Sequence, residues 1–364
     1  GSTQVSGQQA FTLFDTFGFP LDLTELICHE NGLTVDLDGF HEEMEKQRNR
    51  ARNAAAVETG DWQVLHEGET CSLAWDQTEA PCRILRYRKV EQKKKVFYEI
   101  VLDRTPFYAE MGGQVGDQGK LFNDKETVEI FDVKRENNLP VHLASRMPSC
   151  PEAEWTACVD VERRHKSEAN HTATHLLDQA LREVLGDHVT QKGSLITPEL
   201  LRFDFSHFQK VTPEEIRQVE RVVNRLIRED IALQDHRDVP IDEARKMGAI
   251  ALFGEKYGDK VRVVQFDKSV EFCGGCHASS TGRIGLFSII SESSVAAGVR
   301  RIEAVTGEMA EERLFQMQDI LTDLREVFQS KDLRDAVRKS IEENAQLRKQ
   351  VEASTREKLE KMCN

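Results

Sequence analysis

Apolar residues recur at helical spacing in the first part of the chain, from residue 8 to about residue 57. A break at Gly18–Pro20 divides the apolar clusters, and a long polar run begins at Asp38, a suitable N-cap for a helix that continues to Ala56. So short a segment cannot bury its own apolar residues, so we expect a helical layer that packs against a larger body.

Between about residues 62 and 161 the helical spacing gives way to short runs in which apolar and polar residues alternate. Runs such as 95–102 and 127–133, separated by glycine turns, are typical of antiparallel strands and predict a small β-barrel. A glycine-rich string at 107–119 interrupts them. Its backbone N–H groups could bind a phosphate or a carboxylate, although a glycine-rich turn without a ligand is the commoner case.

The next segment mixes the two patterns, with helical spacing at 163–185 and 213–229 and strand-like runs at 201–205 and 261–266. Beyond Gly307 the apolar residues lie on a heavily charged helical pattern, which predicts a helical hairpin or a coiled coil. The predicted fold class is therefore α+β, a small antiparallel β-barrel plus an α/β domain, flanked by helical segments. The predicted domains are residues 3–60, 61–161, 162–307 and 308–364.

Charge and composition narrow the functional classes. The formal net charge is −14, so a polyanion would need a local basic surface, for which Arg83–Lys95 is a candidate; a solvated hairpin with a lysine-rich turn explains that run equally well. No apolar stretch approaches the ~20 residues that span a bilayer, which predicts a soluble protein without a membrane partner. Eight dispersed cysteines indicate free thiols in a reducing, cytoplasmic compartment.

Two short pairs carry the clearest chemistry. His171 and His175 are four residues apart in a helical pattern, which puts both imidazoles on one helix face. Cys273 and His277 enclose two glycines that permit a tight turn. One such pair alone is often a chance surface feature, whereas the two together predict a shared metal site. A thiolate among the ligands favours zinc over magnesium or calcium.

Seven strings, spread from about residue 10 to residue 307, carry a family resemblance. They are Leu13–Thr24, Phe107–Asp117, His171–Leu177, Leu201–His207, Ala251–Asp259, Cys273–His277 and Gly298–Ala304. Together they resemble the editing region of the alanyl-tRNA synthetase family. The resemblance makes residues 162–307 a zinc-binding editing domain and residues 3–60 the tail of the tRNA-recognition domain.

The resemblance implies an aminoacyl-tRNA deacylase that forms part of an alanine-tRNA ligase and serves proofreading in protein biosynthesis. Its partner would be the 3′ end of tRNA(Ala) carrying serine or glycine. ATP and magnesium would serve only an aminoacylation core, which we expect to be absent from this chain. The last helices would lead into a C-terminal region through which the full-length protein forms a homo-oligomer.

By the same resemblance, His171, His175, Cys273 and His277 match the family's zinc ligands, and two further residues are expected at the site. Gln114 would border the editing pocket, and Thr190 would contact a serine hydroxyl, although an ordinary threonine at a helix terminus is the commoner interpretation. Four protein ligands are typical of structural zinc, whereas hydrolytic zinc keeps one position for water. Either one ligand is loose and zinc activates the water, or zinc positions the substrate while a polar group orients the water.

Several alternatives stay open. The family has threonine where this chain has Cys276, so a second thiol could compete with Cys273 as a ligand or oxidise with it; Cys273 matches the family position. Arg202 and Asp204 alternate along a predicted strand and could be structural or line the tRNA end. A threonyl-type seryl-tRNA editing domain, a free-standing editing protein and a non-catalytic, zinc-stabilised tRNA-binding module are the competing functions.

Overall fold

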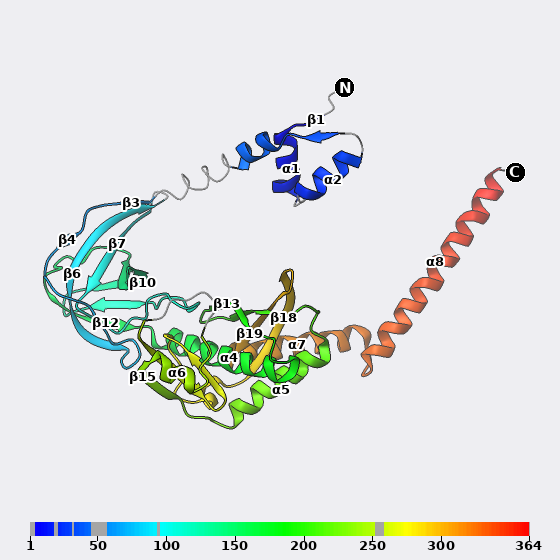
Figure 1. Cartoon of the computed structure of the whole chain (residues 1–364). Coiled ribbons are helices and arrows are strands. Elements are labelled where there is room, and N and C mark those ends of the chain that lie inside the picture. Colours follow the sequence, from blue (N-terminus) through cyan, green and yellow to red (C-terminus); the bar gives the residue numbers. More distant parts are fainter. Residues whose placement is uncertain are drawn as a thin grey trace. The chain divides into compact units, whose positions relative to one another are not determined.

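The computed structural model describes residues 4–17, 21–30, 33–44, 57–92, 95–251 and 258–363 (Figure 1). The chain forms two compact units. One comprises Gly1–Ala109 and Asp117–Val159, and the other comprises Glu110–Gly116 and Asp160–Asn364. Helices and several antiparallel sheets occur together, which confirms the mixed α and β class that the pattern predicted.

The first segment is helical, as its spacing predicted. It contains α1 (Gly7–Phe17), α2 (Leu21–Glu30) and a parallel pairing of β1 (Gln4–Val5) with β2 (Thr34–Val35), followed by a helix from residue 37. The predicted cap at Asp38 is wrong. Asp36 caps this helix instead, because its side chain accepts a 3.0 Å hydrogen bond from the backbone N–H of Gly39. The predicted break at 18–20 and the rest of the polar helix, from residue 45 to residue 56, lie outside the described residues.

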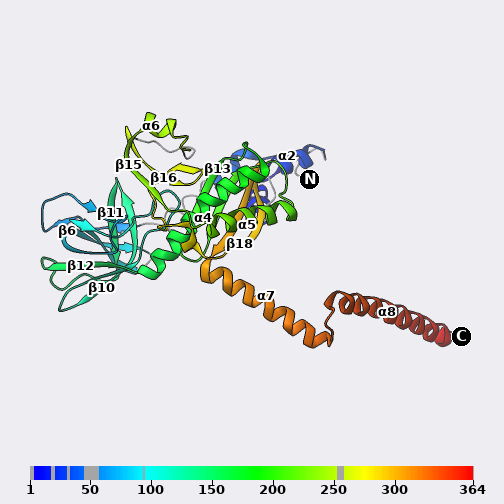
Figure 2. The ribbon, with the colours of Figure 1, turned by 90° about the horizontal axis from the view of Figure 1, so that it is seen from below.

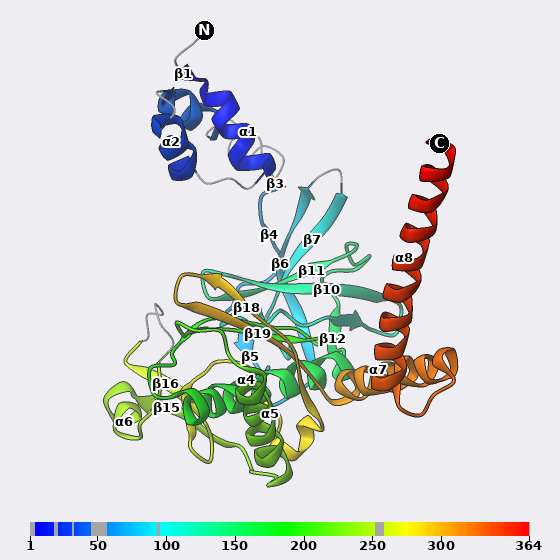
Figure 3. The same ribbon diagram turned by 90° about the vertical axis from the view of Figure 1, so that its right-hand side faces the viewer.

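The first unit is built on one antiparallel sheet (Figure 3). Its strands pair in the order β12 (Glu154–Val159), β9 (Gly119–Phe122), β10 (Thr127–Glu136), β11 (Leu139–Ala144), β7 (Lys95–Leu102) and β6 (Glu79–Gln92), with β3 (Val57–Thr59) and β4 (Gln63–Val64) also on β6. Because β12 pairs with β6 as well, the order of pairings returns to its start. Ile84, Ile100, Leu121 and Trp155 are among the buried residues that alternating positions of these strands contribute to the core. β5 (Cys71–Ser72) and β8 (Arg104–Thr105) form a short parallel pair.

The basic run Arg83–Lys95 lies on the antiparallel strands β6 and β7, which agrees with its hairpin interpretation, and its residues 93–94 lie outside the described residues. Two of its three arginines form ion pairs inside the unit. Arg83 pairs with Glu154, and Arg88 pairs with Glu99 and Glu136 while its guanidinium lies 4.3 Å from the ring centre of Trp62. These contacts favour the solvated hairpin over a polyanion site.

The second unit packs helices against a four-stranded sheet. α4 (Val161–Leu185) and α5 (Pro213–Arg228) cover a sheet of four strands, β13 (Gln191–Ile196), β14 (Leu201–Ser206), β19 (Val299–Thr306) and β18 (Phe287–Ala296) (Figure 3). Leu177, Phe203 and Phe205 belong to the core of this unit. A smaller sheet consists of three strands, β15 (Gln234–Pro240), β16 (Lys260–Phe266) and β17 (Ser269–Phe272). The same unit also contains α6 (Ile241–Lys246) and the short 3₁₀ helix η1 (Thr281–Ile284).

Two long helices end the chain, α7 (Gly307–Phe328) and α8 (Leu333–Cys363) (Figure 2). Their helical nature was predicted from the charged pattern beyond Gly307. Apolar side chains on both helices, such as Ile320, Val327 and Ile341, are exposed. Among the described residues, none of the helices combines the length and the apolar character needed to cross a membrane.

Candidate metal centre

The two predicted pairs meet in the second unit. His171 and His175 lie one turn apart on α4, while Cys273 and His277 lie in and after the turn that follows β17. One potential ligand atom from each residue lies within 4.8 Å of the others. The Sγ atom of Cys273 is 3.4 Å from His171 Nε2 and 3.2 Å from His277 Nε2. The structure therefore confirms that the four side chains form one cluster that could hold a metal ion.

The turn between Cys273 and His277 lies directly against the ring of His171. A Cβ atom on Gly275 would lie 2.0 Å from Cε1 of His171, so only glycine leaves room for that ring. From outside, Arg262 donates to the carbonyl oxygens of Gly275 and Cys273, and its own guanidinium is held by Asp235 at 2.7 Å. The two glycines that suggested a tight turn are thus partly a steric requirement of the cluster.

Gln114 determines which nitrogen of His171 faces the cluster. Its side-chain Oε1 lies 3.0 Å from the backbone N of Cys276 and 2.7 Å from Nδ1 of His171. A backbone N–H can only donate, so the shared atom of Gln114 is its acceptor oxygen. His171 Nδ1 must then carry the proton that it donates, which leaves the lone pair of Nε2 directed towards Cys273.

Polar side chains also lie near the second nitrogen of the other two histidines, within hydrogen-bond distance only for His277. Nδ1 of His277 lies 3.2 Å from Oγ1 of Thr172, which accepts from the backbone N of Ala278 at 3.1 Å. Nδ1 of His175 lies 3.5 Å from a carboxylate oxygen of Glu271, longer than an ordinary hydrogen bond. Supporting contacts of this kind orient metal-binding imidazoles.

Sequence reasoning missed Thr172 and Glu271 as supporting residues. Two signals pointed to them: Thr172 lies inside the predicted His171–His175 motif, and Glu271 lies two residues before Cys273 on the same strand pattern.

Burial favours the form of the three histidines that binds a metal. It lowers the pKa of His175 to about 3 and holds the pKa values of His171 and His277 well below the ordinary value of 6.5. The imidazoles are therefore neutral near pH 7. Behind them, burial raises the pKa of Glu271 to about 7, and burial together with Glu271 does the same for Asp178.

The cluster fits zinc in donor type and spacing. Zinc bonds of about 2.0 Å to nitrogen and about 2.3 Å to sulfur put tetrahedral ligands roughly 3.5 Å apart. The two measured separations from Cys273 Sγ are close to this value. Three neutral imidazoles and one cysteine thiolate are also a donor set that zinc commonly takes.

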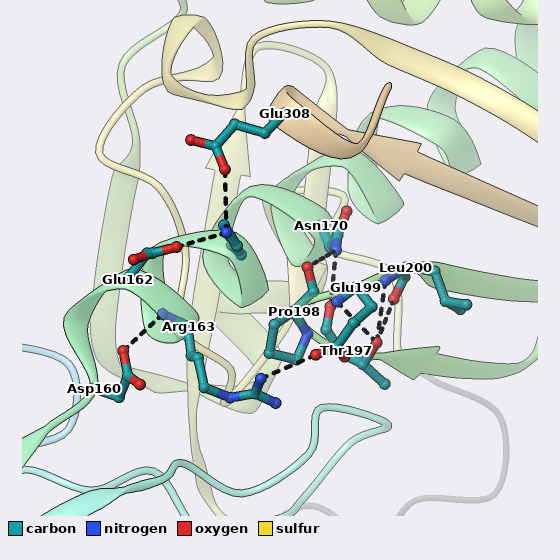
Figure 4. A network of polar contacts seen from close by, with 10 residues as sticks. Asp160, Glu162, Arg163, Asn170, Thr197, Pro198, Glu199, Leu200 and Glu308 are labelled. Atoms are coloured by element: carbon teal, nitrogen blue, oxygen red, sulfur yellow. Dashed lines mark hydrogen bonds and ion pairs between the residues drawn. The ribbon is translucent and has the colours of Figure 1, made fainter. Parts of the chain in front are cut away.

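A separate polar network fixes the start of α4 (Figure 4). Asn170, the residue before His171, donates through Nδ2 to the carbonyl oxygen of Thr197 at 2.8 Å, and its Oδ1 accepts from Thr306 Oγ1 at 2.8 Å. Lys166 lies between Glu162 and Glu308, at 2.7 and 3.1 Å. The helix that carries two of the ligands is thus tied to the loop after β13 and to the first turn of α7.

Gln114 reaches the cluster from the short segment Glu110–Gly116, which pairs with the end of β13. The backbone N of Ile196 donates to Gly113 O at 2.8 Å, and Val115 N donates to Ile196 O at 3.1 Å. The side chain of Gln114 is fully buried, and within the described part of the chain its Nε2 has no hydrogen-bond partner. Its N–H groups are therefore free for a ligand.

Thr190 does not lie beside Gln114. Its Oγ1 lies 2.9 Å from Oγ of Ser206, at the start of β13. Ile196, which pairs with Gln114, is six residues further along, a distance of about 20 Å at the usual rise of about 3.3 Å per residue in a strand. The structure therefore puts the two expected substrate contacts at opposite ends of one strand.

The remaining candidates fall outside the ligand group. Cys276 is buried, and in the described chain its thiol is not among the clustered ligand atoms, which agrees with the choice of Cys273. Asp204 forms a two-pronged ion pair with Arg301, both contacts measuring 2.7 Å, which supports its structural interpretation. Arg202 lies next to it on the same strand, and its Nε has no partner among the described residues.

Two models of known protein families match parts of this chain. A family model described as the threonyl and alanyl tRNA synthetase second additional domain matches residues 261–303, which include Cys273 and His277. A second model, described as tRNA synthetases class II (A), matches residues 1–163.

Curated relatives resemble the chain over nearly its whole length. They include the alanine–tRNA ligases of Bacteroides fragilis, 62% identical over 98% of the chain, and Bacteroides thetaiotaomicron, 61% identical over 98%. The alanine–tRNA ligase of Flavobacterium psychrophilum is 47% identical over 99% of the chain. The chain spans only 41% of the length of the two Bacteroides proteins and 42% of the third.

Proposed function

We propose that this chain is the part of an alanyl-tRNA synthetase that removes wrongly attached amino acids from tRNA(Ala), a proposal that its 62% identity to the alanine–tRNA ligase of Bacteroides fragilis supports. The observation that carries the proposal is the buried cluster of His171, His175, Cys273 and His277. The match of residues 261–303 to a domain shared by threonyl and alanyl enzymes gives further support. The substrates would be tRNA(Ala) esters of serine and glycine.

An editing site is physically useful for these amino acids. One methyl group changes binding by only about 1–3 kcal/mol, so a synthetic site that accepts alanine rejects glycine poorly. Serine differs from alanine by one hydroxyl, which is also difficult to exclude completely. A second site that hydrolyses the wrong ester raises fidelity beyond what one binding step gives.

The reaction is hydrolysis of an ester. The oxygen of water bonds to the carbonyl carbon of the amino acid, the bond from that carbon to the ribose oxygen breaks, and the ribose oxygen takes up a proton. The four clustered residues would hold zinc, which when bound supplies a positive charge that polarises a carbonyl oxygen or a water molecule. The chain's own contribution is a largely buried site in which Gln114 and Thr172 orient two of the histidines and Glu271 lies behind the third.

Two roles for zinc remain within this proposal. In the first, one of the four residues would be a loose ligand, and the zinc held by the others would supply the charge that activates a water molecule. In the second, the four-ligand site stays closed and positions the end of the tRNA while another group orients the water. Of the two expected substrate contacts, Gln114 lies beside the cluster. Thr190 lies about 20 Å along β13 from Ile196, the residue that pairs with Gln114, so its contact with the substrate stays a prediction.

One observation favours a second candidate function. Four protein ligands are typical of a structural zinc site, so the chain could be a zinc-stabilised tRNA-binding module without activity.

Hydrolysis assays separate these functions. We would measure the loss of seryl, glycyl and alanyl esters of tRNA(Ala), with and without zinc, for the native chain and for Cys273→Ala. Zinc-dependent loss of the seryl and glycyl esters that spares the alanyl ester and is abolished by Cys273→Ala is the expected result. Stable seryl ester despite measured tRNA binding would favour the binding module, and equal activity on seryl-tRNA(Thr) would favour a threonyl-type specificity.

A further inference from the structure

We propose that the two ends of the Gln114 amide have separate roles, the oxygen in building the metal site and the nitrogen in binding the carbonyl oxygen of the ester substrate. The second role rests on the proposed function, and the first does not. Both roles follow from the contacts that Gln114 makes and from the one that it lacks.

The oxygen joins three elements of the site. It accepts from Nδ1 of His171 on α4 and from the backbone N of Cys276 in the turn after β17, while the backbone of its own segment is paired with β13. Both donors converge on one atom, so the oxygen fixes the position of the ring and of the turn relative to each other. Loss of this acceptor would leave two buried N–H groups without a partner.

The nitrogen of the same amide, unlike its oxygen, has no hydrogen-bond partner among the described residues. Gln114 is fully buried, yet Nε2 makes no hydrogen bond in the described part of the chain. The oxygen cannot exchange places with it, because the N–H of Cys276 requires an acceptor. Native proteins rarely leave a buried donor unpaired, and a catalytic or binding role is one explanation for such an exception.

The missing partner must be an acceptor, since an amide N–H only donates. Every aminoacyl ester carries one at its reacting centre, the carbonyl oxygen, whereas the serine hydroxyl is present in one substrate only. The carbonyl oxygen gains negative charge as the water oxygen bonds to the carbonyl carbon. A fixed donor at that point stabilises the charge without reorganisation, as in other sites of acyl transfer.

Two substitutions separate the roles. Gln114→Glu keeps an acceptor oxygen for His171 and Cys276 but removes the N–H donor, and Gln114→Met keeps the size of the side chain while it removes both. The matched control is Gln118→Glu, the same change at an exposed position four residues further along. Thermal unfolding of each variant with zinc establishes that it is folded.

Zinc affinity, measured by competition with a chromophoric chelator, tests the oxygen. Gln114→Met should weaken zinc binding by about 10- to 100-fold, the usual effect of losing a supporting contact, whereas Gln114→Glu should bind zinc at least as tightly as the native chain. Native affinity in Gln114→Met would refute the first role, and this readout needs no tRNA.

Hydrolysis of seryl- and glycyl-tRNA(Ala) by zinc-loaded protein tests the nitrogen. Gln114→Glu should lower kcat by about 100-fold for both esters, while Gln118→Glu should match the native chain. A native rate in Gln114→Glu would refute the second role, and a loss confined to the seryl ester would move the contact to the hydroxyl. If the native chain itself leaves both esters intact, the proposed function fails and the nitrogen's role with it, while the zinc result still decides the oxygen's role.

Discussion

Substitution of Gly275 by alanine tests whether the turn after β17 exists to make room for His171. The new methyl group would lie 2.0 Å from Cε1 of His171 and 2.9 Å from Oε1 of Gln114, whereas ordinary contacts of a Cβ begin at 3.4 Å. The ring would therefore have to retreat by about 1.4 Å. Metal–ligand distances tolerate deviations of only about 0.2 Å, so His171 would no longer reach an ion held by the other three residues.

The expected loss exceeds the effect of removing a supporting contact, so zinc affinity should fall by more than about 100-fold. Crowding in a packed region should also cost about 1–3 kcal/mol of unfolding free energy in the absence of metal. Chelator competition measures the first quantity, and urea unfolding with EDTA present measures the second.

Gly274→Ala is the matched control for this prediction. Its methyl group would meet only Cε of Met111, at 2.4 Å, and the end of a methionine side chain can rotate away. Neither glycine has a positive φ, so backbone strain does not distinguish the two substitutions. Native zinc affinity in Gly275→Ala, or an equal loss in both variants, would refute the steric argument.

Three further predictions concern other parts of the chain. Thr172→Val removes the oxygen that contacts His277 Nδ1 and Ala278 N, so zinc affinity should fall by about 10- to 100-fold while Thr190→Val leaves it unchanged, as chelator competition would show. Burial lowers the pKa of His142 to about 4, below its ordinary 6.5, so the neutral form of His142 stabilises the fold fully above pH 6.5. About 3 kcal/mol of unfolding free energy is lost as the pH falls from 6.5 to 4. Urea unfolding at several pH values should show a smaller loss in His142→Gln than in the native chain. Phe203→Ala empties a fully buried core position and should cost about 3–5 kcal/mol, measured by urea unfolding at pH 7; a loss below 1 kcal/mol would contradict the packing.

The metal cluster could be predicted because its signals are local. Helical spacing put His171 and His175 on one face, and two glycines indicated the turn beside Cys273. Glu271 was missed because its role depends on which side chain packs behind His175, which only the folded structure reveals. Gln114 entered through family resemblance alone, since nothing in its local pattern shows that a β-strand about 80 residues later would hold it beside His171.

Other errors also have physical causes. Asp38 was preferred as a helix cap on residue type, but Asp36 has the same type and stands just before the first helical residue, where a carboxylate can accept from the N–H of Gly39. The glycine-rich string was assigned wholly to the strand-rich region, because the pattern of the flanking residues is that of strands. Its middle part pairs instead with Ile196, a contact between distant parts of the sequence that no local pattern encodes.

The grouping of Glu110–Gly116 with the second unit has a consequence for how the protein can be divided. The backbone passes between the two units three times, at residues 109–110, 116–117 and 159–160, so no single cut separates them. A shortened chain that begins at Asp160 would keep all four candidate ligands and lose Gln114. A continuous piece of the chain that keeps Gln114 together with the four candidate ligands must therefore also carry Asp117–Val159, which belongs to the other unit.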